Sequence, residues 1–96
     1  MFAIINHLKL NAPVDRLKQT LEEGAAVVAG IDGLEAIHFV HEGADQVAVL
    51  VFWADAQAAE RGAGAFMSTW FVQHIAPHLN GELQRTMGEV FISVEP

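Results

Sequence analysis

Asn6 occupies a position where a purely structural strand has no need of an amide. Residues 2–10 alternate between two faces, and one face carries Phe2, Ile4, Asn6 and Leu8. An amide among apolar side chains lowers stability unless it finds hydrogen-bond partners. Since asparagine usually serves turns and helix caps, its place inside a strand predicts that Asn6 faces a bound molecule. The alternative is that Asn6 satisfies neighbouring backbone groups.

The histidines do not predict a metal site. His38 and His41 are separated by an odd number of positions in an expected strand, so their side chains point to opposite faces. His74 and His78 have the i, i+4 spacing of a metal-binding pair, but no acidic third ligand lies nearby and Pro77 disturbs the helix. We therefore predict that the chain holds no metal.

Strand-like and helix-like segments alternate along the chain in a defined order. The predicted strands are residues 2–10, 33–41, 46–53 and 85–95, and the predicted helical regions are residues 13–30 and 55–80. The short segment between the second and third strands contains a glycine and fits a hairpin turn. This order predicts an α+β, ferredoxin-like βαββαβ fold. Its four-stranded antiparallel sheet would carry the helices on one face, in a single domain spanning residues 1–96.

The second helical region is expected to be interrupted. Asp55 is a good N-cap, but Gly62 and Gly64 each weaken a helix interior by about 1 kcal/mol relative to alanine. We therefore expect a break at these glycines, acting as a flexible lip over a cleft. A new helix is expected to begin near Ser68 and to end at Asn80.

Composition excludes several classes of partner. The net charge is -7, and the five lysines and arginines form no cluster that could neutralise a row of phosphates. The chain has no cysteine, which excludes disulfides and thiolate metal sites and is typical of a cytoplasmic protein. No apolar stretch approaches the roughly 20 residues that span a bilayer, and the first residues do not resemble an export signal. We expect a cytoplasmic domain without nucleic-acid or membrane partners.

The predicted strand 46–53 is apolar on both faces. Its two sets of side chains are Val47, Val49, Val51 and Trp53 on one face, and Ala48, Leu50 and Phe52 on the other. Two helices cover only one face of a sheet, and Ile5, Ile37 and Phe39, or their neighbours on the opposite face, would add to the uncovered one. Exposing five or six large side chains would forgo on the order of 10 kcal/mol. We therefore predict a two-fold homodimer joined through the sheet face.

The element order, the length and the two-sided apolar sheet resemble the antibiotic biosynthesis monooxygenase (ABM) family of the dimeric α/β-barrel superfamily. The likeness covers nearly the whole chain. Within it, the stretch "NHLKL" at residues 6–10 resembles the Asn-x-Leu-x-Leu stretch of bacterial heme-degrading monooxygenases of the IsdG type. The stretch "GIDGLE" at residues 30–35 resembles the turn that follows their first helix. The resemblance implies that two copies form a dimeric α/β barrel.

The resemblance also implies a cofactor-independent oxygenase for a flat phenolic or quinol-like molecule bound between sheet and helices. Without a metal or flavin, such a substrate must lose a proton to become electron-rich. The site then needs a base, a hydrogen-bond donor for the oxyanion, and apolar walls. On this basis Asn6 is predicted to donate to the oxyanion and His74 to act as the base, with His7 as the alternative base. The predicted walls are Phe66, Trp70 and Phe71.

Two other functions stay open at this point. A non-catalytic dimer of the same architecture could hold a hydrophobic molecule or serve a stress-related assembly, because this scaffold hosts many functions. The other is heme degradation, for which the resemblance implies an asparagine, a tryptophan and a histidine. Asn6 matches the asparagine, whereas the other two positions do not align with Trp70 and His74. The oxygenase hypothesis predicts a dry pocket of roughly a few hundred cubic ångströms between the helices and the sheet, with Asn6 at its wall.

Overall fold

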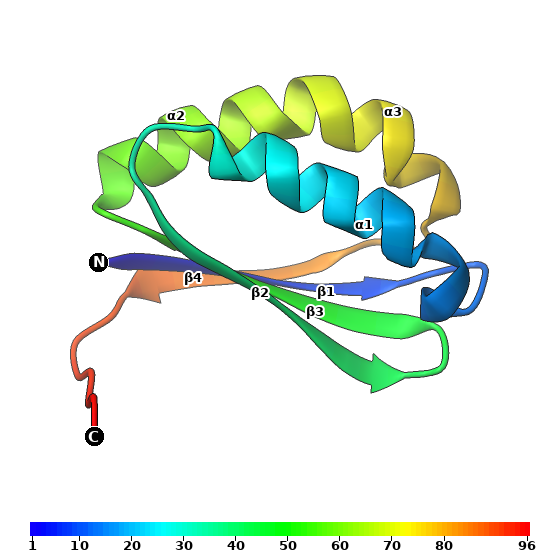
Figure 1. The fold of residues 1–96 in the computed structure, drawn as a ribbon, viewed down its shortest axis with the longest axis horizontal. Coiled ribbons are helices and arrows are strands. Elements are labelled where there is room, and N and C mark those ends of the chain that lie inside the picture. The colour runs from blue at the N-terminus through cyan, green and yellow to red at the C-terminus, as the bar shows by residue number, and fades with distance from the viewer.

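A four-stranded antiparallel sheet with helices on one face makes up the computed structural model, which describes residues 1–96 (Figure 1). The strands are β1 (Phe2–Lys9), β2 (Leu34–Gly43), β3 (Gln46–Trp53) and β4 (Gln84–Glu89), in the sheet order β2-β3-β1-β4. The helices are α1 (Val14–Ala29), α2 (Ala56–Phe66) and the short α3 (Val72–His74). This arrangement confirms the predicted ferredoxin-like fold, and the sheet of the single chain is not closed.

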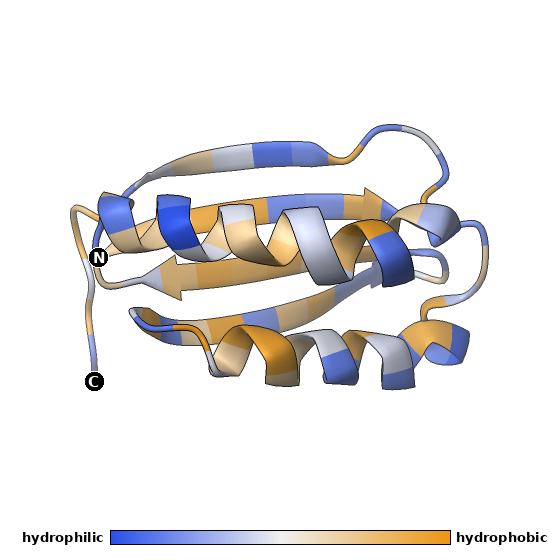
Figure 2. Cartoon of the chain, turned by 90° about the horizontal axis from the view of Figure 1, so that it is seen from above, coloured by the Kyte–Doolittle hydropathy of each residue, from blue (hydrophilic) through white to orange (hydrophobic).

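The two central strands have the faces that the sequence predicts. Seen from the helix side, β1 and β3 are the most hydrophobic strands of the sheet (Figure 2). In their pairing, Ile4 lies opposite Val51, and Asn6 lies opposite Val49. The side chains of Ile4, Val49 and Val51 are buried in the core beneath the helices. Asn6 therefore projects from the helix-covered face of the sheet.

Helix α1 packs on the sheet through the predicted apolar stripe. Val14, Leu17, Leu21 and Val28 are all buried. Gly24 belongs to the same stripe and is also buried, which the apolar periodicity alone did not indicate. A Cβ at residue 24 would lie 2.6 Å from a ring carbon of Trp70, so glycine allows the tryptophan to approach the helix backbone.

The predicted break in the second helical region is wrong. Asp55 caps α2 as expected, with its side chain accepting a hydrogen bond of 2.7 Å from the Ala58 amide. The helix then continues through Gly62 and Gly64, so these residues form no flexible lip. Gly62 is buried against the Trp53 ring, where a side chain would collide with the indole. The cost of glycine in the helix is thus offset by close packing on the sheet.

A π-helical turn stands where a new helix was expected to start. This turn, η1 (Met67–Phe71), connects α2 to α3 without a gap in helical backbone angles. The hydroxyl of Thr69 donates to the Ala65 carbonyl at 2.7 Å, and that of Ser68 donates to the Gly64 carbonyl at 2.9 Å. These bonds satisfy carbonyls near the irregular turn. A final 3-10 turn, η2 (Ala76–His78), contains Pro77 and ends the helical region.

The fourth strand is shorter than predicted. β4 ends at Glu89, which pairs with Phe2, and the last backbone bond runs from the Val90 amide to the Met1 carbonyl. Residues 90–96 therefore lie beyond the last pair of the sheet. They leave it on the side away from the helices (Figure 1).

The uncovered face of the sheet is apolar at its centre and polar at one end. The side chains paired across it form three rows, Ala36–Phe52–Ala3–Gly88, His38–Leu50–Ile5–Thr86 and Val40–Ala48–His7–Gln84. Ile37 and Phe39 are not among them, because Phe39 pairs with Val49 on the helix-covered face. Their neighbours Ala36, His38 and Val40 take the open face, which is the alternative that the sequence left open.

None of the helices combines the length and apolar character that crossing a membrane requires.

Candidate functional site

A small apolar cavity lies between the sheet and the helices. Its volume is about 70 Å³, and 11 of its 14 lining residues are hydrophobic. Its polar lining comes from Asn6 of β1 and Arg85 of β4. The volume is smaller than the predicted few hundred cubic ångströms, and it corresponds to only about five water molecules.

The helical wall of the cavity is built at the π-helical turn. Phe66, Met67, Trp70 and Phe71 all line the cavity from this part of the chain. The rings of Phe66 and Trp70 stack with centroids 5.6 Å apart and planes inclined by 19°. π-helical turns often occur at functional sites, because the extra residue redirects the side chains that follow it. The structure thus brings the three predicted wall residues together with Asn6.

A hydrogen bond joins the two polar residues of the cavity. Asn6 and Arg85 lie opposite each other on β1 and β4, and the Arg85 Nε donates to the Asn6 Oδ1 at 2.8 Å. Because a guanidinium can only donate, this bond fixes which end of the amide faces Arg85. The Nδ2 group of Asn6 makes no hydrogen bond to the rest of the chain. The N–H donors of Asn6 are therefore free, whereas its carbonyl oxygen already accepts a hydrogen bond.

Arg85 brings a positive charge to this apolar site. Its Nη2 lies 3.5 Å from the Met67 sulfur, and no carboxylate forms an ion pair with it, although the chain is acidic overall. Sequence reasoning missed Arg85. The missing information was the pairing register of β1 with β4, which sets Arg85 beside Asn6.

A larger groove adjoins the cavity. Its volume is about 500 Å³, and it is bordered by residues that include Phe2, Glu60 and Met87. The two spaces share four lining residues, Ile4, Ala63, Met67 and Arg85. The contact between Arg85 and Met67 thus lies where the two spaces meet, and moving these two flexible side chains would enlarge the cavity.

The two histidines predicted as bases are not brought to the cavity. His74 is exposed and is absent from the lining, and its ring stacks on Trp70 with centroids 4.7 Å apart. His7 projects from the opposite face of the sheet, as its position in the strand predicts. Asn6 and His74 therefore do not meet around one cavity in this structure.

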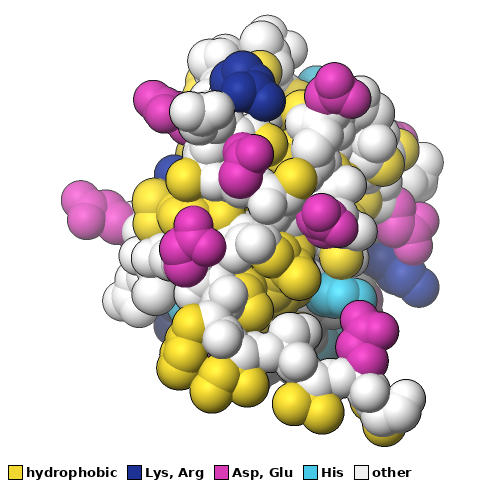
Figure 3. All heavy atoms as spheres, turned by 90° about the vertical axis from the view of Figure 1, so that its left-hand side faces the viewer, with side chains coloured by type: hydrophobic (Ala, Val, Ile, Leu, Met, Phe, Trp, Pro, Cys, Tyr) yellow, Lys and Arg dark blue, Asp and Glu magenta, His cyan; other side chains and the backbone are white.

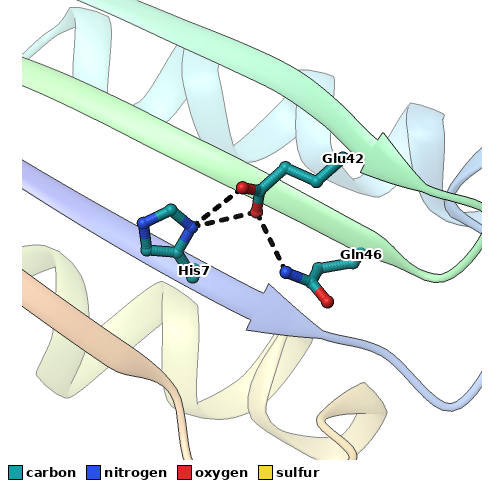
Figure 4. Close-up of polar contacts among 3 residues, drawn as sticks. All are labelled: His7, Glu42 and Gln46. Carbon is teal, nitrogen blue, oxygen red and sulfur yellow. Dashed lines mark hydrogen bonds and ion pairs between the residues drawn. The ribbon is translucent and has the colours of Figure 1, made fainter.

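His7 instead belongs to a small polar cluster on the open face (Figure 4). Its Nδ1 lies 2.9 Å from one carboxylate oxygen of Glu42 and 3.1 Å from the other. The side chain of Gln46 donates to the same carboxylate at 3.3 Å. The hydrogen bond from His7 holds the pKa of the Glu42 carboxyl below its ordinary value of 4.5, and the Gln46 bond acts in the same direction.

The lowered pKa of Glu42 predicts a small pH dependence. Since the folded-state pKa is depressed, the stabilising contribution of Glu42 is present above pH 4.5 and is lost as the pH falls through the folded-state value. A carbon-13 NMR titration of the Glu42 carboxyl should therefore give a midpoint below 4.5, and His7→Phe should move this midpoint upward. Equal midpoints in the two proteins would show that His7 does not cause the shift.

The residues of the site do not fit a heme or a metal ion. No histidine lines the cavity, and its volume of about 70 Å³ is far below that of a porphyrin-sized ligand. No group of three or more histidine, aspartate or glutamate side chains is arranged to hold a metal ion. We derive no chemistry through either group.

Comparison with known proteins gives a clear result only at the level of structure. No family model and no curated protein match the chain by sequence. The oxygenase SnoaB from Streptomyces nogalater (mutant N63A) matches with a TM-score of 0.82 and 11% identity over 99% of this chain and 97% of that chain. The monooxygenase ActVA-Orf6 from Streptomyces coelicolor, in complex with nanaomycin D, matches with a TM-score of 0.75 and 15% identity over 99% and 91%. The chain has the ABM fold.

The ABM fold also includes a heme-degrading protein. MhuD from Mycobacterium tuberculosis, with two hemes bound in its active site, matches with a TM-score of 0.76 and 17% identity over 99% of this chain and 100% of that chain. At such low identities these similarities establish the shared fold and nothing about the reaction. The function has to be argued from the site.

Proposed function

We propose that this ABM-fold protein is a cofactor-independent monooxygenase for a small aromatic or polycyclic phenol. The observation that carries the proposal is the hydrogen-bonded pair of Asn6 and Arg85 at the wall of an otherwise apolar cavity. Such a pair can bind an oxyanion while the apolar walls exclude water. SnoaB, a cofactor-independent oxygenase, has the same fold, so the fold is compatible with this reaction class.

The proposed role of the pair is to favour the ionised form of the substrate. A positive charge a few ångströms from a phenol lowers its pKa, so the hydroxyl releases its proton more readily. The phenolate oxygen would accept hydrogen bonds from the Asn6 amide and the Arg85 guanidinium. Oxygen then reacts with the electron-rich ring. The substrate loses its hydroxyl hydrogen and one ring hydrogen and gains one oxygen atom, while the second oxygen atom leaves as water.

The proposed ligand would occupy both the cavity and the adjoining groove. A drug-sized ligand needs roughly 300–1,000 Å³, which the cavity of about 70 Å³ does not provide but the groove of about 500 Å³ does. We propose that one ring enters the cavity between Phe66, Trp70 and Phe71. Displacement of Met67 then joins the two spaces.

The prediction that His74 acts as the base has a direct test. His74→Phe removes the proton acceptor and keeps an aromatic ring on Trp70. Because His74 does not line the cavity, we expect kcat to stay within about threefold of wild type, with the proton released to solvent. A loss of about 10²- to 10⁴-fold, as is usual when a general base is removed, would assign that role to His74.

The proposed reaction is tested with naphthols and hydroxyanthracenes in the presence of oxygen-18 gas. Oxygen consumption with one labelled atom in the quinone product supports the proposal. Binding without oxygen consumption would favour the second candidate, a non-catalytic protein that holds a hydrophobic molecule. That candidate is favoured by the absence of a histidine or a carboxylate from the cavity lining. Because the site does not fit a heme, we expect no Soret band on heme addition.

We also propose that two copies associate through the open face of the sheet. Ile5, Leu50 and Phe52 form its apolar centre and are only partly buried in the single chain. Covering them with the same face of a second copy would form a closed, two-fold interface. Ile37 and Phe39 lie on the other face, so β2 contributes Ala36, His38 and Val40 to this interface instead.

A further inference from the structure

One row of side chains forms the floor of the cavity from one edge of the sheet to the other. The pairing registers place four residues in line across the strands β2, β3, β1 and β4, namely Phe39, Val49, Asn6 and Arg85. All four line the cavity. Neighbouring strands are about 4.8 Å apart, so the row is about 14 Å wide. The lining of the cavity therefore reaches both edges of the sheet.

The helices roof this row without closing its ends. Both long helices run along the strands, so a row across the sheet passes beneath them (Figure 2). Helix α1 contributes Leu21 and Gly24 to the lining, and α2 contributes Ala63 and Phe66. The cavity thus lies in a passage between the two layers, with one end at the β4 edge and the other at the β2 edge.

The end at β2 meets a second groove, which lies between α1 and β2. The volume of this groove is about 380 Å³, and it shares Leu21 and Phe39 with the cavity. Leu21 is buried, whereas Phe39 is 39% exposed, because it stands on an edge strand at the margin of the helical layer. Phe39 therefore closes this end of the cavity, and rotation of its ring into the groove would open it.

The two ends of the passage differ in chemistry. At the β4 end, Arg85 and Asn6 present a positive charge and free N–H donors. At the β2 end, the residues that the cavity shares with the groove are both apolar. An anionic ligand is therefore stabilised at the β4 end only, while the β2 end suits a small uncharged molecule.

The rim of the groove between α1 and β2 strengthens this difference. Lys18 on this rim lies 3.9 Å from Glu22, so the negative charge of Asp15 is left over. Acidic side chains are also spread over the end of the molecule that carries both termini (Figure 3). The negative charge at this rim repels a phenolate but has no effect on a molecule without charge.

We propose that dioxygen enters the cavity at the β2 edge, past Phe39, while the phenol enters at the β4 edge. The inference rests on the proposed function, because that reaction brings two substrates to one cavity. A ring that enters from the side of Arg85 and Met67 blocks that end, so dioxygen needs another way in. Apolar cavities readily take up small apolar molecules, which makes the apolar end the suitable entrance. Phe39 then controls the access of dioxygen.

Xenon tests this entrance without turnover, because it is an uncharged probe that binds in apolar cavities. Xenon NMR measures its rate of exchange between water and the cavity. Phe39→Trp should slow the exchange by at least about fivefold, and Phe39→Ala should accelerate it by a similar factor. Since Phe39 is partly exposed, both variants should fold, and melting temperatures check this.

Met67→Trp is the matched control, because it places the same ring at the other end of the passage. It should weaken phenol binding and change xenon exchange by less than about twofold. Exchange that depends on Met67 and not on Phe39, equally on both, or on neither would overturn the proposed entrance.

Oxygen-electrode kinetics with a naphthol test the same entrance during the reaction. Phe39→Trp should lower kcat/KM for dioxygen by at least about fivefold, with the Kd of the naphthol changed by less than about threefold. An unchanged kcat/KM for dioxygen would overturn the entrance and leave the proposed reaction standing. If no phenol is oxidised, the proposed reaction fails, and xenon exchange still decides whether Phe39 controls entry to the cavity.

Discussion

Arg85→Gln should lower kcat/KM for a phenolic substrate by about 10²- to 10³-fold, the usual effect of losing an oxyanion donor. Glutamine keeps hydrogen-bonding capacity but removes the charge that favours the phenolate. Arg85 lies outside the buried core, so the melting temperature should change little. The activity loss should therefore come from the site and not from unfolding.

The pKa of a bound phenol provides a measurement that does not depend on turnover. In wild type, Arg85 should lower this pKa by about 1–3 units from its usual value near 10, as followed by the absorbance of the phenolate. Arg85→Gln should abolish the lowering, and Asn6→Ala should reduce it. Arg61→Gln, which removes an arginine that lines neither space, is the control. If the pKa were lowered equally in all variants, Arg85 would have no part in ionising the ligand.

Leu50→Asp should dissociate the proposed dimer. Leu50 lies between His38 and Ile5 at the centre of the open face, so each dimer would bury two unpaired carboxylates. The dimer Kd should rise by more than about 100-fold. Analytical ultracentrifugation measures this change directly.

Val72→Asp is the control for the Leu50 substitution. Val72 is 56% exposed on the helical side, so a carboxylate there should leave the dimer intact. If Leu50→Asp left Kd unchanged, the open face would not be the interface. Dissociation by both variants would indicate a general effect of added negative charge.

Local patterns in the sequence were sufficient to predict the layers of the fold. A repeat of two residues reveals the buried face of a strand, as in Ile4, Asn6 and Leu8. A repeat of 3.6 residues reveals the buried face of a helix, as in Leu17 and Leu21. The cap at Asp55 is a local interaction of the same kind. These features need no knowledge of which strands are neighbours.

The features that were missed all depend on contacts between distant segments. Arg85 reaches Asn6 only through the register of β4 on β1, and Ile37 faces the helices because of its pairing with Val51. Gly62 remains helical because the Trp53 ring fills the space beside it. Residues 90–95 have a strand-like composition but lack a neighbour in the sheet after Val90, so composition alone overestimated the length of β4.

The candidate site was predictable in its walls but not in its charge. Phe66, Trp70 and Phe71 surround the cavity as expected, because their spacing gathers them at one part of a helix. The choice of His74 as the base rested on its i, i+4 spacing from Trp70, and its ring does stack on Trp70, but His74 does not line the cavity. The site pairs Asn6 with the positive charge of Arg85, whereas the sequence predicted Asn6 with a histidine base.

An NMR titration with a naphthol, observing the side-chain N–H signals of Asn6 and Arg85, tests directly whether these two residues bind the phenol. We expect the Asn6 Nδ2 and Arg85 Nε signals both to shift, with the same Kd as that obtained from phenolate absorbance. Shifts confined to open-face residues such as Leu50, with both side-chain signals unchanged, would contradict it.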